Sequence, residues 1–480
     1  MPLLRLIAEG VGPFERLDVD LSDGKGNPHL GPHIFAGVNG SGKSTVLRTL
    51  AWVMDIGASG FPHEDWQHLL DGHPHSRALA VIQSQGAPVL IFACSLGNEN
   101  YLKSQPWIEH ELRDWCLNTQ GFSPSNEASV SGRRTSLQHW VSNYSPEANA
   151  TWSSFASSGA TGLRMPVSNH AAYSPSRSLR FLKSPDLTRA LSRPNEQSLA
   201  FEMAVQNESV QAWLLGLYSK RAIARDRHQS GDQYARSLDR FENALRLLYG
   251  KDVSFDVELE PSFQPRLKAF GRSLDFSQLP DGVRSTVGWI ADFMMRQDLV
   301  KWDATLGGRR PGILLLDEVD AHLHPLWQRK LLPAMREALP DVQILVTSHS
   351  PFVISSCPGS RVHVLELDAK GRAYARPPVD SPIGESVTTT LKEIFGVDSR
   401  FDVLTERELD EWNTLKRAES AGSLSASDRS RLEELTVTLA ERSEELRSIV
   451  ASPRTISESV LRSLTGNGPK PHPVKRRKRA

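Results

Sequence analysis

Glycines, a lysine and a serine occur in Gly37–Thr45 (GVNGSGKST) at the spacing G-x-x-x-x-G-K-[ST]. Glycines let backbone N–H groups approach a triphosphate closely, and a helix that starts behind the loop adds the positive end of its dipole. On this pattern Lys43 bridges the outer phosphates and the Ser44 hydroxyl binds Mg²⁺. An apolar run at 33–36 and a helix-compatible stretch at 45–52 flank the loop. The residues expected to contact the nucleotide are Gly37, Asn39, Gly40, Ser41, Gly42, Lys43, Ser44 and Thr45.

A second segment, Gly312–Pro325, begins with the apolar run Ile313–Leu316 and continues with Asp317 and Glu318. A continuous apolar run is typical of a parallel strand that is buried on both faces. Open α/β sheets bind ligands at the carboxyl ends of such strands. We therefore expect Asp317 to contact Mg²⁺ and Glu318 to activate the attacking water as a catalytic residue.

A metal site is an alternative for the residues that follow, because His322 and His324 form a His-x-His pair close to Asp320. Such a pair can bind zinc. A turn from strand to helix explains the same residues, and the neighbouring motifs favour that interpretation.

A third strand is expected at Val342–Thr347, where another apolar run is followed by Ser348, His349 and Ser350. A histidine at the carboxyl end of this strand can reach a γ-phosphate at the same edge of the sheet. A histidine that occurs without other motifs more often has a structural role, but the presence of the other motifs favours a catalytic role for His349.

With Gln278–Ser285 (QLPDGVRS) added, the motifs resemble those of ATP-binding-cassette-type ATPases, and within them the RecF/OLD-like group. Gly37–Thr45 matches Walker A, Leu314–Glu318 matches Walker B, Val319–Pro325 resembles the D-loop and His349 matches the switch histidine. Gln278–Ser285 and the helix expected at 286–295 resemble the signature loop. The resemblance covers about residues 1–400 and extends to PtuA-like ATPases of prokaryotic anti-phage systems, including Septu and retron-associated forms. The segment LKEIFGV at 391–397 also resembles those proteins.

The resemblance implies an α/β fold, a P-loop ABC-type ATPase head with a mixed sheet, flanking helices, an inserted helical lobe and a C-terminal helical appendage. It implies ATP and Mg²⁺ as cofactors, and a homodimer that sandwiches ATP. In that dimer Asp281, Gly282 and Ser285 of one chain close over nucleotide held by the other. Pro280 departs from the pattern, because a serine hydroxyl usually binds the γ-phosphate there. Slow turnover, or ATP binding used as a switch, would follow.

Lys43 and Asp317 lie 274 positions apart, which is too far for motifs on neighbouring strands of a compact P-loop unit. A large insertion is therefore expected between them. We predict the first part of the ATPase lobe, with Walker A, at 1–117, followed by a flexible polar insertion at 118–168 and a helical lobe that ends in the signature loop at 169–290. The second part of the ATPase lobe, with Walker B, D-loop and switch histidine, is expected at 291–400. A helical hairpin at 401–465 and a basic disordered tail at 466–480 follow it.

Two sets of residues compete for the role of coupling nucleotide to lobe movement. Tyr173 and Arg177 resemble a Tyr-x-x-x-Arg stretch of this ATPase group, and a strand end with a surface arginine explains them equally well. Gln83 and Gln85 follow the phosphate loop at the distance of a Q-loop. The sequence leaves this choice open.

Composition limits the function classes. The 480 residues include 56 Lys and Arg and 56 Asp and Glu, which argues against a basic protein that wraps nucleic acid. Six basic residues lie in 466–480 and can attract DNA or RNA phosphates, as can a dimer surface. Three separated cysteines, an N-terminal stretch that alternates like an edge strand and no apolar run of membrane length predict a cytoplasmic protein without membrane contact.

We expect this ATPase to control a separate effector, such as an HNH-type nuclease, in anti-phage defence or DNA metabolism. The hairpin at 401–465 is a candidate docking element. The alternatives are the nucleotide-binding subunit of a transporter, against which Pro280 and the D-loop residues argue, and a RecF-like DNA-repair ATPase without a defence role. A Toprim nuclease signature is not visible after His349.

Overall fold

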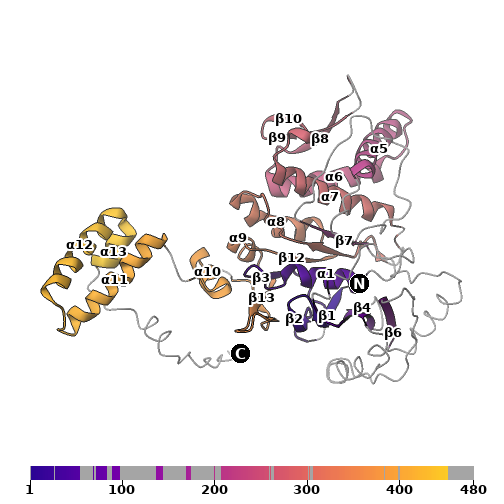
Figure 1. Ribbon diagram of the computed structural model, residues 1–480. Helices are drawn as coiled ribbons and strands as arrows, with labels where there is room; N and C mark the ends of the chain where they lie inside the picture. The colour runs from indigo at the N-terminus through magenta and orange to yellow at the C-terminus, as the bar shows by residue number, and fades with distance from the viewer. Residues whose placement is uncertain are drawn as a thin grey trace, which may run out of the picture. The chain divides into compact units, whose positions relative to one another are not determined.

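The computed structural model of the chain contains two compact units, Met1–Gly396 and Val397–Ala480, each of which is described by itself (Figure 1). The structure describes residues 2–25, 27–54, 69, 72–83, 89–97, 137–143, 169–174, 199, 207–258, 260, 264–300, 302, 306–382, 384–397 and 401–451. The predicted polar insertion, apart from 137–143, and the predicted tail at 466–480 lie outside these residues, as do Arg177 and Gln85.

A mixed sheet of seven strands forms the centre of the first unit, in the order β14-β13-β3-β12-β11-β7 with β15 beside β13. The neighbours from β13 to β7 run parallel, so their carboxyl ends meet at one edge. The strands expected from continuous apolar runs, β11 and β12, are buried along their whole length. The bounds are β3 His33–Gly37, β7 Asn169–Tyr173, β11 Gly312–Leu316, β12 Val342–Thr347, β13 Arg361–Leu367, β14 Ala373–Ala375 and β15 Val379–Asp380.

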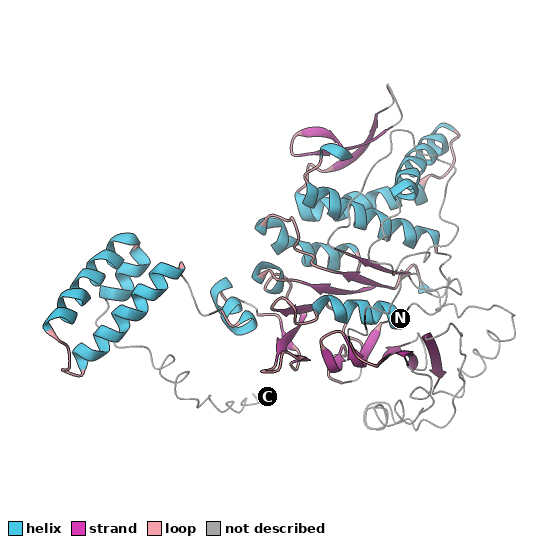
Figure 2. Ribbon diagram, in the orientation of Figure 1, coloured by secondary structure: helices cyan, strands magenta, loops and turns pink. Residues whose placement is uncertain are grey.

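A second, antiparallel sheet has the order β2-β1-β4-β5-β6. Its strands are β1 Leu3–Val11, β2 Phe14–Asp20, β4 His75–Gln83, β5 Val89–Gly97 and β6 Leu137–Asn143. The expectation of an edge strand at the N-terminus is wrong, because β1 pairs on both sides, with β2 and with β4. Helix α1, Lys43–Met54, packs between this sheet and the central one, and buries Leu47 and Leu50 against Leu6 and Leu345 (Figure 2).

The inserted lobe contains the helices expected from 3–4 residue spacing and also a small sheet that was not expected. The helices are α5 Asn207–Asp226, α6 Asp232–Tyr249 and α7 Asp281–Leu299, and the sheet contains β8 Ser254–Glu258, β9 Gln264–Ala269 and β10 Arg272–Asp275. A short 3-10 helix, Phe276–Gln278, connects β10 to α7. Alternate residues of β8 are buried, and the alternation of polar and apolar residues in its sequence was a signal for a half-buried strand.

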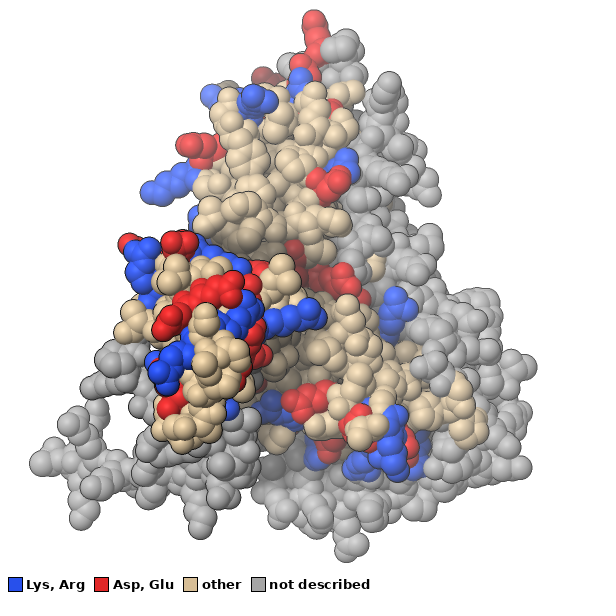
Figure 3. Space-filling view, turned by 60° about the vertical axis from the view of Figure 1, so that its left-hand side comes forward, with Lys and Arg blue, Asp and Glu red and all other residues tan. Residues whose placement is uncertain are grey.

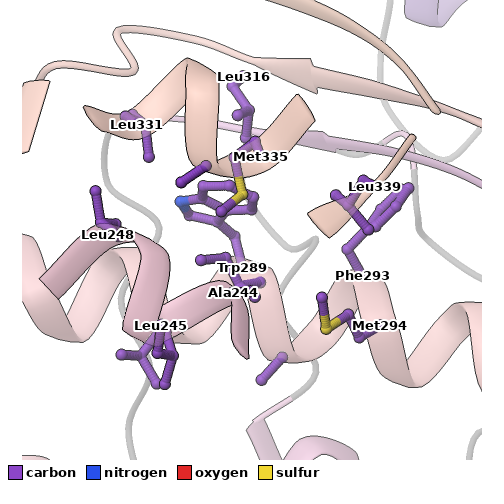
Figure 4. Packing of buried hydrophobic residues seen from close by; sticks show 14 of the residues in the cluster. Ala244, Leu245, Leu248, Trp289, Phe293, Met294, Leu316, Leu331, Met335 and Leu339 are labelled. Carbon is purple, nitrogen blue, oxygen red and sulfur yellow. The ribbon is translucent and has the colours of Figure 1, made fainter. Parts of the chain in front are cut away.

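Helix α7 is buried among its neighbours and is thereby fixed in place. Trp289 of α7 lies in the same apolar cluster as Leu248 of α6 and Met335 of α8, Pro325–Ala338 (Figure 4). Burial of a tryptophan and the residues around it contributes several kcal/mol, about 25 cal/mol for each Å² of apolar surface. The inserted lobe and the central sheet therefore share one core.

The second unit is a cluster of helices, α11 Val403–Ser420, α12 Ala426–Arg442 and α13 Glu444–Ala451. The sequence predicts two helical segments here, and the structure divides the second of them at Ser443. Ser443 is extended, with φ −158°, and its Oγ accepts a hydrogen bond from the N–H of Leu446, which favours the start of a new helix. Leu432, Leu435, Leu439 and Leu446 pack in its core.

Two short helices complete the first unit, α9 Pro351–Ile354 and α10 Val387–Phe395. Among the described residues, no helix is both long and apolar enough to cross a membrane. On the face seen in Figure 3, the described basic and acidic side chains lie interspersed, without a large area of one sign.

Candidate nucleotide site

The loop between β3 and α1 is tightly packed where its glycines lie. A Cβ at Gly37 would lie 2.2 Å from the carbonyl oxygen of Leu365, and a Cβ at Gly42 would lie 2.3 Å from the Phe14 ring. Gly42 also has φ 86°, a conformation that side chains rarely adopt. These positions therefore require glycine, as the phosphate-loop pattern expects.

The other loop residues predicted to contact the nucleotide differ in their exposure to solvent. Asn39 and Gly40 are exposed, whereas Ser44 and Thr45 are half-buried at the start of α1. Ser41 is fully buried, and its Oγ has no hydrogen-bond partner within the described residues. A buried hydroxyl without a partner costs free energy and is compatible with a ligand that would complete it.

Lys43 lies folded over the loop. Its Nζ donates to the carbonyl oxygens of Gly37 at 3.0 Å and Val38 at 2.8 Å. Burial lowers the pKa of Lys43, while the charges of Asp317 and Glu318 act in the opposite direction. The carboxylates of Asp317 and Glu318, which follow β11, are therefore close enough to affect the pKa of the Lys43 ammonium group.

Two hydroxyl groups converge on one carboxylate oxygen. Ser44 Oγ donates to Asp317 Oδ1 at 2.9 Å, and Thr347 Oγ1 donates to the same oxygen at 2.6 Å. Thr347 also accepts the backbone N–H of Glu318 at 2.6 Å. Thr347 was missed in the sequence, although its place at the end of β12, one step before Ser348, was a usable signal.

The two acidic residues differ in exposure. Asp317 is buried, and its backbone N–H donates to the carbonyl oxygen of Tyr173 at 2.9 Å. Glu318 is exposed and has φ 44°, a left-handed conformation that is uncommon for residues other than glycine. Strained backbone of this kind costs about 1–3 kcal/mol and gathers at functional sites. The turn at Glu318 therefore presents its carboxylate to solvent beside a fixed Asp317.

His349 follows β12 at the same edge of the sheet and is half-buried. Burial and the charge of Lys43 lower the pKa of His349, against the opposite effect of Asp320 and the other carboxylates. A neutral imidazole can donate one hydrogen bond and accept another. The described structure thus brings Lys43, Ser44, Asp317, Glu318 and His349 to one edge.

Of the expected signature-loop residues, Asp281 and Gly282 lie on the first turn of α7 and Ser285 on the second, and Gly282 packs against the segment expected to form the D-loop of the same chain. Asp281 is exposed and pairs with Arg284, and Ser285 is buried. A Cβ at Gly282 would lie 2.1 Å from the carbonyl oxygen of His322. The nearest atoms to that position belong to His322 and Leu323, so the start of α7 packs directly on the D-loop.

A buried polar cluster joins α7 to the central sheet. Tyr173 donates its O–H to Asp292 Oδ2 at 2.7 Å, and Arg296 Nε donates to the same oxygen at 2.6 Å. All three side chains are fully buried. Burial and Asp292 raise the pKa of Tyr173 well above its ordinary range. Tyr173, one of the candidates for the coupling role, therefore contacts α7. The spacing of Asp292 and Arg296, an oppositely charged i, i+4 pair on an apolar helix, was the signal in the sequence for its two partners.

One of the two histidines of the alternative zinc hypothesis has a structural use. His324 caps α8, because its Nδ1 accepts the backbone N–H of Leu326 at 3.3 Å. His322 and His324 are both exposed, and no group of three or more His, Cys, Asp or Glu with the geometry of a metal site occurs among the residues described.

The parallel strands, the glycine-rich loop and the acidic strand end form an α/β head of the P-loop type, and the expected fold class with its mixed sheet and flanking helices is confirmed. Residues 167–355 match the family model described as "AAA domain, putative AbiEii toxin, Type IV TA system".

Curated relatives agree with that class. The chain is 34% identical over 189 residues to "Septu protein PtuA" of Bacillus thuringiensis, a match that covers 36% of this chain and 45% of that protein. It is 33% identical over 101 residues to "Retron Ec83 probable ATPase" of Escherichia coli, covering 21% of this chain and 19% of that protein. The matched segments thus span less than half of these relatives. The resemblance to retron and Septu ATPases is confirmed.

Among solved structures, the chain is similar to an SMC head bound to the C-winged helix domain of ScpA, with TM-score 0.44, 12% identity and coverage of 79% of this chain and 98% of that chain. It is also similar to an SMC head domain from Thermotoga maritima, with TM-score 0.39, 15% identity and coverage of 78% and 99%.

Proposed function

We propose that the chain is an ABC-type ATPase that binds MgATP and hydrolyses it slowly in order to control a partner effector. The observation that carries this proposal is the convergence of Ser44 and Thr347 on Asp317, next to the phosphate loop. Mg²⁺ is usually held by one or two protein oxygens together with phosphates and waters, which fits this small donor set.

The loop also fits a triphosphate. Gly40 has φ 82° and no atom within 4 Å of its Cβ position, so the loop presents backbone at this point, and the buried Ser41 hydroxyl has no hydrogen-bond partner within the described residues. Lys43 would exchange its two carbonyl contacts for phosphate oxygens. Bound Mg²⁺ would neutralise charge that develops on the phosphates.

Glu318 and His349 are the proposed catalytic residues. The exposed Glu318 carboxylate would orient and activate water, and the neutral His349 imidazole would donate a hydrogen bond to the terminal phosphate. Pro280 stands at the N-cap position of α7, where it offers neither a hydroxyl nor an N–H. Its place at this end of the signature helix supports slow turnover.

We further propose a head-to-tail homodimer, in which Asp281, Gly282 and Ser285 of one chain close over the nucleotide of the other. The exposure of Asp281 leaves it free to approach a second copy. Two equivalent sites related by a two-fold axis would result, which is the commonest symmetry of homo-oligomers.

An effector such as an HNH-type nuclease, in anti-phage defence, is the proposed target, and the similarity to retron and Septu ATPases supports this choice. The second unit is the proposed docking element. A chain that ends at Gly396 should bind MgATP normally and lose the effector, because the units divide at that point. Loss of MgATP binding in that chain would place the helices within the ATPase itself.

Calorimetric titration with MgATP tests the central proposal. Lys43→Ala should abolish the binding seen with the unmodified chain, whereas Lys25→Ala, at an exposed lysine, should leave it unchanged. Equal affinity in the unmodified chain and Lys43→Ala would refute the assignment of the site.

A further inference from the structure

One side chain outside the recognised motifs connects the two turns that carry the proposed catalytic residues. Gln328 lies in the first turns of α8 and is half-buried. Its Nε2 donates to the carbonyl oxygens of Leu323 at 2.9 Å and Asp320 at 3.2 Å. Its Oε1 accepts the hydroxyl of Ser350 at 2.7 Å. The amide therefore joins three groups at once.

The two turns are tied at their near ends by the backbone. Val319 N–H, just after Glu318, donates to the carbonyl oxygen of Thr347. The turn that carries Glu318 continues to Leu323, and the turn that carries His349 continues to Ser350. Gln328 makes the contact between their far ends.

Ser350 is held in place by several further hydrogen bonds. It is buried, and its Oγ accepts the backbone N–H groups of Phe352 at 3.1 Å and Val353 at 3.4 Å, which caps α9. Its own N–H donates to Ser348 Oγ at 3.0 Å. Because His349 stands between Ser348 and Ser350, a hydrogen bond to Ser350 restrains the backbone that carries His349.

We propose that Gln328 is a positioning residue, which sets the distance between the turn that carries Glu318 and the turn that carries His349. This inference rests on the proposed ATPase function. Catalysis by positioned groups is sensitive to displacements of about 1 Å. Loss of the connection should therefore slow the chemical step and leave nucleotide affinity nearly unchanged, because Gln328 is outside the phosphate loop.

The hydrogen-bond chemistry favours glutamine at this position. An amide offers two N–H donors to the two carbonyl oxygens and one oxygen to the Ser350 hydroxyl. A glutamate of the same shape would still accept from Ser350 but would set an acceptor oxygen against two carbonyls. Gln328→Glu thus releases the D-loop turn alone, whereas Ser350→Ala releases the other turn and also removes the side-chain cap of α9.

The test is single-turnover hydrolysis of MgATP, which measures the chemical step even where turnover is slow, together with MgATP affinity and thermal unfolding. Gln328→Glu and Gln328→Ala should lower the rate about tenfold or more, with affinity within about twofold, since the lost interactions act on the transition state. Lys330→Ala, at an exposed position on the same helix, is the matched control and should match the unmodified chain.

A double variant guards against a simple effect on folding. If Gln328 acts through Ser350, Gln328→Ala with Ser350→Ala should be no slower than the slower single variant. Additive rate losses, or a Gln328→Glu rate within about twofold of the unmodified rate at normal stability, would overturn the inference. Failure of the unmodified chain to bind or cleave MgATP would instead refute the function itself, and the affinity measurement separates the two.

Discussion

The Ser44 hydroxyl lies 2.9 Å from Oδ1 of Asp317, although the two residues are 273 positions apart in the chain. Ser44 is the second residue of α1, the helix that follows β3, and Asp317 directly follows β11, with β12 between the two strands. A third residue, Thr347 at the end of β12, donates to the same carboxylate oxygen. Three neighbouring strand ends therefore supply one small oxygen cluster, and this arrangement can be tested residue by residue.

Thr347→Val should lower ATP turnover about tenfold while MgATP affinity changes little, because a lost hydrogen bond to a charged group costs about 1.5–3 kcal/mol. Valine keeps the shape but removes both the donor to Asp317 and the acceptor for the Glu318 N–H. Steady-state kinetics gives the result. Thr414→Val, on α11 in the other unit, is the control, and equal rates in both variants would contradict the role of Thr347.

Glu318→Gln should retain MgATP without cleaving it, because the amide keeps the shape of the side chain and cannot accept a proton from water. Sedimentation velocity with MgATP should then show a dimer. Glu337→Gln, an exposed glutamate on α8, should leave hydrolysis at the unmodified rate. A species that stays monomeric at micromolar concentration with nucleotide would rule out the proposed ATP-bound dimer, and an unchanged rate would require another base.

Gly282→Ala should destabilise the first unit by about 1–3 kcal/mol, because overpacking forces backbone to move. The new Cβ would lie 2.1 Å from the carbonyl oxygen of His322, which belongs to the D-loop backbone. Gly216→Ala in α5 is the control, since nothing lies within 4 Å of its Cβ and alanine favours helix. Urea unfolding measures the stability of both variants. If Gly282→Ala does not lower the stability, the contact between Gly282 and His322 is loose.

Tyr173→Phe should lower stability by about 1–3 kcal/mol, the cost of removing one partner from a buried polar group. The hydroxyl that is lost donates to Asp292, between β7 and α7. Tyr374→Phe removes an exposed hydroxyl that donates to Glu366 and should change stability by a few tenths of a kcal/mol at most, about the effect of a surface substitution. Thermal unfolding of the two variants decides whether the buried contact matters.

Stability should fall as the pH falls below about 6.5, the ordinary pKa of histidine. Burial lowers the pKa of His363 to about 3 and holds the pKa of His33 well below its usual range. Below pH 6.5 the unfolded chain takes up protons that the folded chain does not, so each histidine contributes a loss of about 1.4 kcal/mol per pH unit. The two rings lie 3.0 Å apart, Nδ1 of His33 to Nε2 of His363.

Urea unfolding at pH 7.5, 6.5 and 5.5 measures this dependence. His363→Gln should reduce the slope between pH 6.5 and 5.5 by up to about 1.4 kcal/mol per pH unit, because the contribution of one buried histidine is removed. His228→Asn, at an exposed histidine with φ 54° that asparagine tolerates, should leave the slope unchanged. A stability that is flat from pH 7.5 to 5.5 would contradict neutral histidines at both positions.

The sequence alone determined the glycine-rich loop, the two buried strands and the resemblance to retron and Septu ATPases. These features are local, because G-x-x-x-x-G-K-[ST] and an apolar run before paired carboxylates state their own chemistry within a few residues. Helices within 401–465 were also expected from the sequence. Their division at Ser443 was not, because it depends on the conformation of a single residue.

Only the tertiary structure showed which distant residues meet. Thr347 meets Asp317 30 positions away, Gln328 meets Ser350 22 positions away and Asp292 meets Tyr173 119 positions away. No local pattern states which of these residues meet. The same holds for β1, whose alternating residues predicted an edge although strands pair with it on both sides. Strand order and the packing of α7 against β7 and the D-loop are set by burial of apolar surface across the whole unit. Side-chain spacing reveals periodicity and motifs, whereas neighbours in space are decided when the layers pack.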